Sequence, residues 1–151
     1  MKSARNFKIH ELVCPDIYKR DKELAWRYFR PELIDFIDWF RERIDRPVYI
    51  NNWYWGGDKT QRGYRCNLCP LVKNKNVLYA SAHMLGAGVD FNVKNVHPND
   101  VREYLKDNIH EFFNDNPCYI RKCRIESNIL APTWVHIDFF EHTNDGIIYE
   151  F

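Results

Sequence analysis

Two short segments of the sequence alternate between apolar and polar residues, residues 89–93 (VDFNV) and 134–139 (WVHIDF). Because successive side chains of a β-strand point to opposite faces of a sheet, a period of two predicts strands with one apolar and one polar face. The polar positions include Asp90 and His136, whose side chains can bind metals or transfer protons. The fold is therefore expected to contain a sheet with an apolar face against the core and a chemically active face opposite.

Helices are predicted on either side of these segments. From Pro31 to Ile44, apolar residues recur at steps of three and four, and a similar stripe runs from Pro98 to Phe112. Proline at the first helical position and an apolar stripe are both typical of an amphipathic helix. Asn116 and Pro117 end the second one.

The remaining segments complete the predicted order. Residues 47–53 and 119–127 predict two further strands, and residues 128–132 form a connection of hairpin length to the strand at 134–139. Residues 7–18 predict an extended or irregular lead-in, in which Pro15 favours a turn or a helix start. The resulting order predicts an α+β fold with a small antiparallel sheet and flanking helices.

Length and composition predict one globular domain, residues 1–151. The chain is 45% hydrophobic and 16% aromatic, which disfavours disorder, and 22 basic against 21 acidic residues argue against a nucleic-acid partner. No apolar stretch resembles a membrane span or a signal peptide, so we expect no membrane partner. We expect a monomer made in the cytosol.

The polar faces of the predicted strands supply a set of metal ligands. Asp90, His136 and Glu126 fall on the polar sides of three neighbouring strands. His83 lies seven residues before Asp90, and the glycines of residues 86–88 allow the turn that returns its imidazole to the same point. Two imidazoles and one carboxylate are the ligand set of a catalytic zinc ion with an open position for water.

Residues 81–90 (SAHMLGAGVD) resemble the SxHxxGxAxD motif of the zinc D-alanyl-D-alanine carboxypeptidases and related peptidoglycan endopeptidases. Gly88 stands where that motif usually has alanine. Residues 134–138 (WVHID) are similar to the second signature of the family, a tryptophan-flanked histidine on the last core strand. Residues 7–18, 52–57 and 61–65 also resemble phage-type members. The resemblance covers most of the chain and implies the fold group that these peptidases share with hedgehog signalling domains.

The resemblance implies one zinc ion per chain, held by His83, Asp90 and His136, with a water molecule as nucleophile. It also implies a peptidoglycan peptide as the substrate. Many relatives carry the catalytic acid three residues before the last histidine, where this chain has Thr133. Glu126 is the candidate replacement, because the predicted hairpin sets it across from the strand of His136. The alternative is that Glu126 is a solvated strand residue.

Four further residues are candidates for supporting roles. Arg65, preferred as the catalytic cation, or Arg62, a substrate-binding candidate, would neutralise a developing oxyanion or bind a substrate carboxylate. Ser81 would bind substrate or hold His83, unless it is only a local cap. Asp138 shares a face with His136 and would orient that ligand, unless it forms only an edge salt bridge.

The five cysteines are an odd number in a chain with no signal peptide, which favours reduced thiols. Cys66 and Cys69, together with Cys118 and Cys123, could form a four-thiolate zinc site, as in a zinc-ribbon binding module. The alternative is that all of them are free or packing thiols.

Taken together, the residues and the resemblance predict a zinc metallopeptidase that degrades the cell wall. It would act as a D-Ala-D-Ala carboxypeptidase or as an endopeptidase on a stem peptide or cross-bridge, as a phage endolysin does. The second possibility is a catalytically inactive metal-binding or virion-structural module of the same fold, because Thr133 replaces the usual acid.

Overall fold

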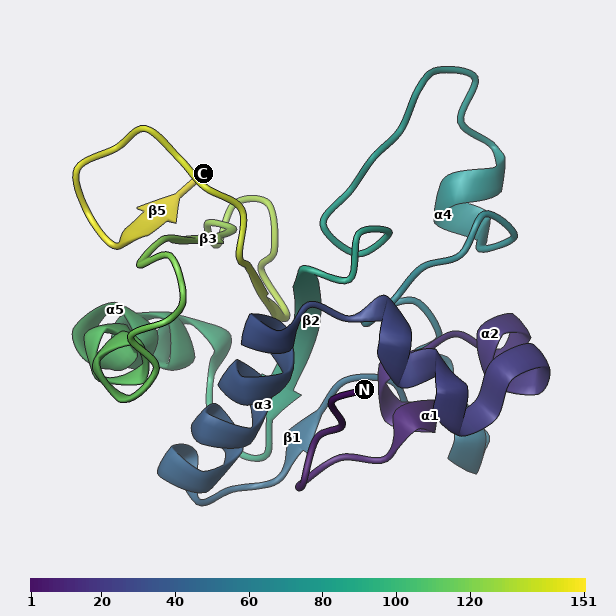
Figure 1. The fold of residues 1–151 in the computed structure, drawn as a ribbon, viewed down its shortest axis with the longest axis horizontal. Coiled ribbons are helices and arrows are strands. Elements are labelled where there is room, and N and C mark those ends of the chain that lie inside the picture. The colour runs from purple at the N-terminus through teal and green to yellow at the C-terminus, as the bar shows by residue number, and fades with distance from the viewer.

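The computed structural model describes residues 1–151 and has an α+β fold around a small sheet (Figure 1). Three short helical segments come first: α1 (Ile9–Leu12), α2 (Pro15–Asp21) and the 3-10 helix η1 (Lys22–Tyr28). The later elements, in chain order, are α3 (Pro31–Ile44), β1 (Val48–Tyr49), the 3-10 helix η2 (Trp53–Trp55), α4 (Pro70–Lys73), β2 (Gly88–Val93), α5 (Pro98–Asp115), β3 (Cys123–Ile125), β4 (Val135–Asp138) and β5 (Ile148–Glu150). None of the helices has the length and apolar character that crossing a membrane requires.

The five strands form one sheet in the order β1-β2-β4-β3-β5. All neighbours are antiparallel except β3 and β5, which are parallel, so the expectation of a purely antiparallel sheet was wrong. Strand β4 pairs with β2 on one edge and with β3 on the other, so β5 pairs with the free edge of β3. The chain reverses direction between β4 and β5, and β5 is therefore antiparallel to β4. Because β3 is also antiparallel to β4, β5 runs parallel to β3.

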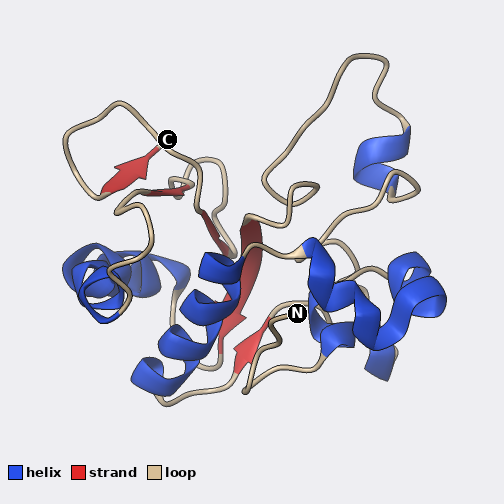
Figure 2. Ribbon diagram, viewed as in Figure 1, coloured by secondary structure: helices blue, strands red, loops and turns tan.

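The apolar face of the sheet packs against α3 and α5 (Figure 2). Phe40 of α3 packs on Phe91 of β2, with ring centroids 5.1 Å apart. Phe36 contacts Phe112 of α5 at 5.7 Å and Phe139 at 5.4 Å. Since these contacts cover the apolar positions of the alternating segments, the predicted helices and the predicted core face are confirmed. The polar positions of β2 and β4 lie on the other face.

The lead-in is helical rather than extended. Helix α1 begins after Lys8, whose backbone N–H donates to the Glu11 carboxylate at 2.7 Å, and Pro15 begins α2. The available signals were the spacing of three between Ile9 and Leu12, both buried, and the proline at the start of α2. The strands expected at 47–53 and 119–127 are also shorter than predicted, because only β1 and β3 within them pair with neighbours.

The turn before β2 requires glycine, as predicted. Gly86 has a φ of 63°, in the left-handed region, and a Cβ there would lie 1.9 Å from the carbonyl oxygen of Tyr28. Glycine at this position therefore allows the chain to turn between His83 and the start of β2.

We expect Gly88→Ala to destabilise the protein by about 1–3 kcal/mol, because it overpacks the sheet beneath the polar face. A Cβ at Gly88 would lie 2.8 Å from the Cβ of Ala82 and 3.1 Å from that of Asp138. Chemical denaturation of the two proteins measures the change. Gly146→Ala is the control, since its nearest contact is 3.4 Å. Equal stability of Gly88→Ala and the native protein would show that the sheet yields at this point.

Candidate metal centre

His83, Asp90 and His136 come together on the polar face of the sheet, and all three side chains are buried. Asp90 of β2 lies directly opposite His136 of β4 in the antiparallel register. His83 reaches them from the turn before β2. The three predicted ligand residues are therefore neighbours in the fold, although His83 and His136 are 53 positions apart in the sequence.

One atom of each residue points to a common centre. Asp90 Oδ1 lies 3.3 Å from His83 Nε2 and 2.7 Å from His136 Nδ1. With metal–ligand bonds of about 2.0–2.2 Å, the atoms of a tetrahedral zinc site lie roughly 3.3–3.5 Å apart. The His83–Asp90 separation has this value, the Asp90–His136 separation is shorter by roughly 0.6 Å, and the ligand atoms of the group all lie within 4.8 Å of one another.

The second nitrogen of each imidazole is held by an acceptor. His83 Nδ1 lies 2.8 Å from the carbonyl oxygen of Gly63, and His136 Nε2 lies 3.1 Å from Asp138 Oδ2. Each acceptor favours a proton on the nitrogen that it contacts. A metal ion at the centre would replace the proton through which His136 Nδ1 hydrogen-bonds to Asp90, and both histidines would then have the tautomer that a metal ligand needs.

The electrostatics of the site favour a positive charge at its centre. Burial alone would raise the pKa of Asp90, but the imidazole of His83 and a hydrogen bond from His136 outweigh it and lower the pKa. Burial alone would lower the pKa of His136, but hydrogen bonds to Asp138 and Asp90 outweigh it and raise the pKa to about 9. The surroundings thus stabilise a carboxylate and a bound cation in one place.

Asp138 is fully buried and links the site to β3. Its carboxylate accepts two hydrogen bonds from the Arg124 guanidinium, both 2.9 Å, in addition to the contact with His136. Burial would raise the pKa of Asp138, but hydrogen bonds from His136 and Arg124 hold it below its ordinary value. Asp138 therefore lies where the sequence placed it, beside His136, and it also forms the salt bridge that was the alternative.

We expect Asp138→Asn to weaken zinc binding at this site by about 10–100-fold, because the buried charge that orients His136 is lost. Competition with a chromophoric chelator measures the affinity. Asp58→Asn is the control, since Asp58 is exposed and pairs only with Lys59. An unchanged affinity in Asp138→Asn would leave Asp138 with a structural role alone.

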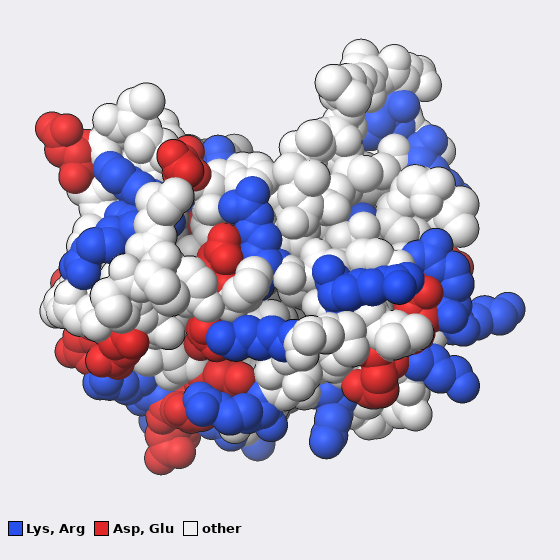
Figure 3. Space-filling model, viewed as in Figure 1, with Lys and Arg blue, Asp and Glu red and all other residues white.

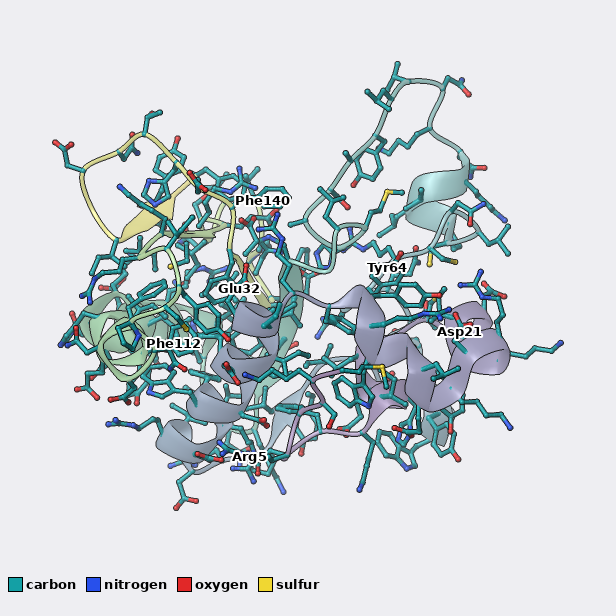
Figure 4. All side chains as sticks on the ribbon, in the orientation of Figure 1. Arg5, Asp21, Glu32, Tyr64, Phe112 and Phe140 are labelled. Carbon is teal, nitrogen blue, oxygen red and sulfur yellow. The ribbon has the colours of Figure 1, made fainter.

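The three ligands open into a cavity of about 210 Å³. Its lining residues come from the turn at 79–83, from β2, β3 and β4, and from the end of the chain; they include Arg65, Ser81, Arg124, Glu126, Phe140 and Phe151. Figure 3 shows the surface hollowed between the part that carries β3 and β5 and the projecting segment around α4, with charges of both signs beside it. Phe140 lies at this side of the molecule in Figure 4.

Glu126 directly follows β3 and lies opposite His136. The β3–β4 register pairs Ile125 with Ile137, and the backbone N–H of Glu126 donates to the carbonyl oxygen of His136 at 3.4 Å. Glu126 is half-buried, lines the cavity, and its negative charge contributes to the raised pKa of His136. The expected hairpin register is confirmed, and the carboxylate of Glu126 belongs to the cavity of the metal ligands.

The two arginines of the 62–65 loop have different surroundings. Arg65 Nη2 donates to Asp90 Oδ2 at 2.9 Å, and its Nε donates to the carbonyl oxygen of Gln61 at 2.6 Å. Arg62 instead donates to Asn92 Oδ1 at 2.5 Å and lines a neighbouring pocket, outside the cavity of the metal ligands. The side chain of Arg65 thus contacts the Asp90 carboxylate, whereas Arg62 contacts Asp90 only through its backbone carbonyl oxygen, which accepts a hydrogen bond from the Asp90 N–H at 2.7 Å.

Ser81 lines the cavity, and its hydroxyl lies 3.4 Å from the backbone N–H of Met84 in the turn that carries His83. Thr133, the residue three positions before His136, is exposed, and its carbonyl oxygen accepts a hydrogen bond from Asn92.

Sequence reasoning missed Arg124 and Gly63. The period of two already put Arg124 on the same strand face as Glu126, so its place beside Asp138 could have been inferred. Gly63 acts through its backbone carbonyl, which no side-chain pattern reveals.

A second group of possible metal ligands is formed by Cys14, Cys66 and Cys69, all buried. The four-thiolate grouping is wrong, because Cys118 is exposed elsewhere and Cys123 is buried in β3. Cys14 joins Cys66 and Cys69 instead. A hydrogen bond from Cys69 lowers the pKa of Cys14 to about 6 although burial opposes it.

The three-dimensional arrangement thus contains two separate groups of residues that could bind a metal ion. Comparison of the chain with protein-family models, with curated proteins and with solved structures found no match.

Proposed function

We propose that this protein is a zinc-dependent peptidase that hydrolyses a peptide bond in peptidoglycan. The observation that carries the proposal is the convergence of His83 Nε2, Asp90 Oδ1 and His136 Nδ1 at the base of a cavity that Glu126 also lines. Two histidines and one carboxylate leave a coordination position open, which suits catalysis rather than structural support. The proposal includes the hedgehog/D-Ala-D-Ala peptidase-like fold that the motifs imply.

A zinc ion held here by His83, Asp90 and His136 would polarise the scissile carbonyl and lower the pKa of a water molecule. The Glu126 carboxylate would accept a proton from the attacking water and give it to the amine nitrogen as the carbon–nitrogen bond breaks, so that a carboxylic acid and an amine leave. Arg65 Nη2 stabilises the carboxylate form of Asp90 through the 2.9 Å hydrogen bond. Arg65 Nη1 makes no hydrogen bond within the protein and is available to a substrate oxygen.

The lining of the cavity supports a short peptide substrate. Arg65 and Arg124 bring positive charge to a space of about 210 Å³, which suits a terminal carboxylate, while Tyr79, Phe140 and Phe151 give it apolar walls for a small side chain such as alanine. The resemblance implies cleavage of either the terminal D-Ala-D-Ala bond or a stem-peptide bond, and a peptide containing either bond suits a cavity with this lining. As a phage-type lysin, the protein would reach the wall after holin-type release.

Mass spectrometry of purified muropeptides incubated with the zinc-loaded protein tests the proposal. A carboxypeptidase removes one alanine from a pentapeptide stem, whereas an endopeptidase splits a cross-linked dimer into two products whose masses sum to the substrate plus one water. Either product supports the proposal and identifies the bond. Unchanged muropeptides of every class contradict it.

The second candidate is a metal-binding or virion-structural module without hydrolytic activity. The specific observation in its favour is Thr133, which is exposed and carries no acid at the position where relatives have one. This module would bind zinc through the same three ligands and would leave every muropeptide intact.

A further inference from the structure

Three cysteine sulfurs meet on the side of the molecule away from β3 and β5. Cys14 immediately precedes α2, while Cys66 and Cys69 lie in the loop that leads into α4. Cys14 Sγ is 3.5 Å from Cys66 Sγ, and Cys66 Sγ is 3.8 Å from Cys69 Sγ. All three sulfurs lie within 4.8 Å of one another, and the exposed fractions of the residues are 1%, 7% and 1%.

We propose that Cys14, Cys66 and Cys69 bind a second zinc ion. Zinc–sulfur bonds of about 2.3 Å in a tetrahedron place neighbouring sulfurs roughly 3.8 Å apart. Two of the three sulfur separations, 3.5 and 3.8 Å, are close to this spacing, and the third is within 4.8 Å. Thiolates select soft or borderline ions, and a tetrahedral set of sulfurs is typical of zinc.

Other uses of three thiols fit less well. In a [4Fe–4S] cluster each cysteine binds a different iron, so the cysteine sulfurs lie farther apart than two bonds to one ion allow, and a [2Fe–2S] cluster takes four cysteines where this group has three. A disulfide requires sulfurs at about 2.05 Å and uses only two of the three residues. One metal ion is the arrangement that employs every member of the group.

The ion would join two segments that are distant in sequence. Next to Cys14, the carbonyl oxygen of Leu12 accepts a hydrogen bond from the backbone N–H of Tyr64 at 2.7 Å, and Val13 pairs with Tyr64 in an isolated bridge. Figure 4 shows Tyr64 on the side of α2 and α4. A zinc ion here would fasten the 62–69 loop to the N-terminal helices.

This loop also serves the candidate metal centre. Gly63 provides the carbonyl oxygen that orients His83, and Arg65 contacts Asp90. The proposed thiolate site thus anchors the segment from which both contacts arise. No fourth histidine, cysteine or carboxylate joins the group, so water or a small solution ligand would complete the tetrahedron.

Zinc content per chain, measured by mass spectrometry of the protein prepared under reducing conditions, tests this proposal. We expect two zinc ions in the native protein and one in Cys69→Ser. Cys118→Ser, which changes an exposed thiol outside the group, is the matched control and should keep both. His83→Ala should lose the other ion and keep the thiolate-bound one. If the histidine site binds nothing, the native protein holds one ion, which Cys69→Ser alone removes.

A measurement on the native protein guards against misfolding of the variant. Cobalt(II) substituted for zinc should give the intense near-ultraviolet absorption of thiolate-to-metal charge transfer, and titration with a mercurial should abolish it with release of the ion. X-ray absorption should show zinc–sulfur distances of about 2.3 Å. Absence of any sulfur-bound metal in the native protein, or equal zinc content in Cys69→Ser, would overturn the proposal.

Discussion

Replacement of Glu126 by glutamine is expected to lower kcat for muropeptide hydrolysis by about 10²–10⁴-fold, the usual contribution of a positioned general base. Glutamine keeps the size of the side chain and its place opposite His136, but its amide does not accept a proton from water. Zinc content should be unchanged, because Glu126 is not one of the three converging ligands. Product formation followed by mass spectrometry gives the rate.

The matched control for this variant is Glu141→Gln, which changes an exposed glutamate outside the cavity and should retain the native rate. If the native protein hydrolyses muropeptides and Glu126→Gln does so at the same rate, another group accepts the proton. In that case Glu126 is only a solvated residue at the end of β3.

Replacement of His83 by alanine is expected to remove the metal ion from the centre and to lower hydrolysis by at least about 10³-fold. The ion is expected to supply several kcal/mol of transition-state stabilisation, and each 1.4 kcal/mol corresponds to a factor of ten. With one imidazole gone, only Asp90 and His136 remain to bind the ion. Parallel measurement of zinc content and initial rate checks both effects.

His110→Ala is the control, because His110 is an exposed residue of α5 that belongs to neither metal group. Circular dichroism should show the same helix content in both variants, since His83 lies in a turn and its imidazole makes a single hydrogen bond to the backbone, with the carbonyl oxygen of Gly63. Native activity in a His83→Ala protein that has lost this zinc would exclude a catalytic role for the ion.

The convergence of His83, Asp90 and His136 could be predicted because its signal is local. The alternation of β2 and β4 puts Asp90 and His136 on the polar face whatever strands lie between them. The turn at 86–88, with Gly86 in the left-handed region, accounts for the return of His83. Glu126 lies opposite His136, on the strand where it was expected, although the connection between β3 and β4 is residues 126–134 rather than the predicted 128–132.

The parts that could not be predicted depend on pairing between distant segments. Cys14 lies 52 residues before Cys66, and nothing near it in the sequence indicates that its sulfur meets the other two. The same holds for β5, a three-residue strand whose parallel pairing with β3 follows only from the occupied edges of β4. Arg62 and Arg65 are three residues apart, and only their partners Asn92 and Asp90 distinguish them.

The central claim is that three atoms of this chain, His83 Nε2, Asp90 Oδ1 and His136 Nδ1, bind one zinc ion. Anomalous scattering at the zinc edge from crystals of the zinc-loaded protein tests this most directly. The predicted result is a peak about 2.0–2.2 Å from each of the three atoms, with a fourth position facing the cavity of Glu126. Zinc-saturated crystals with no peak between these residues would contradict the claim.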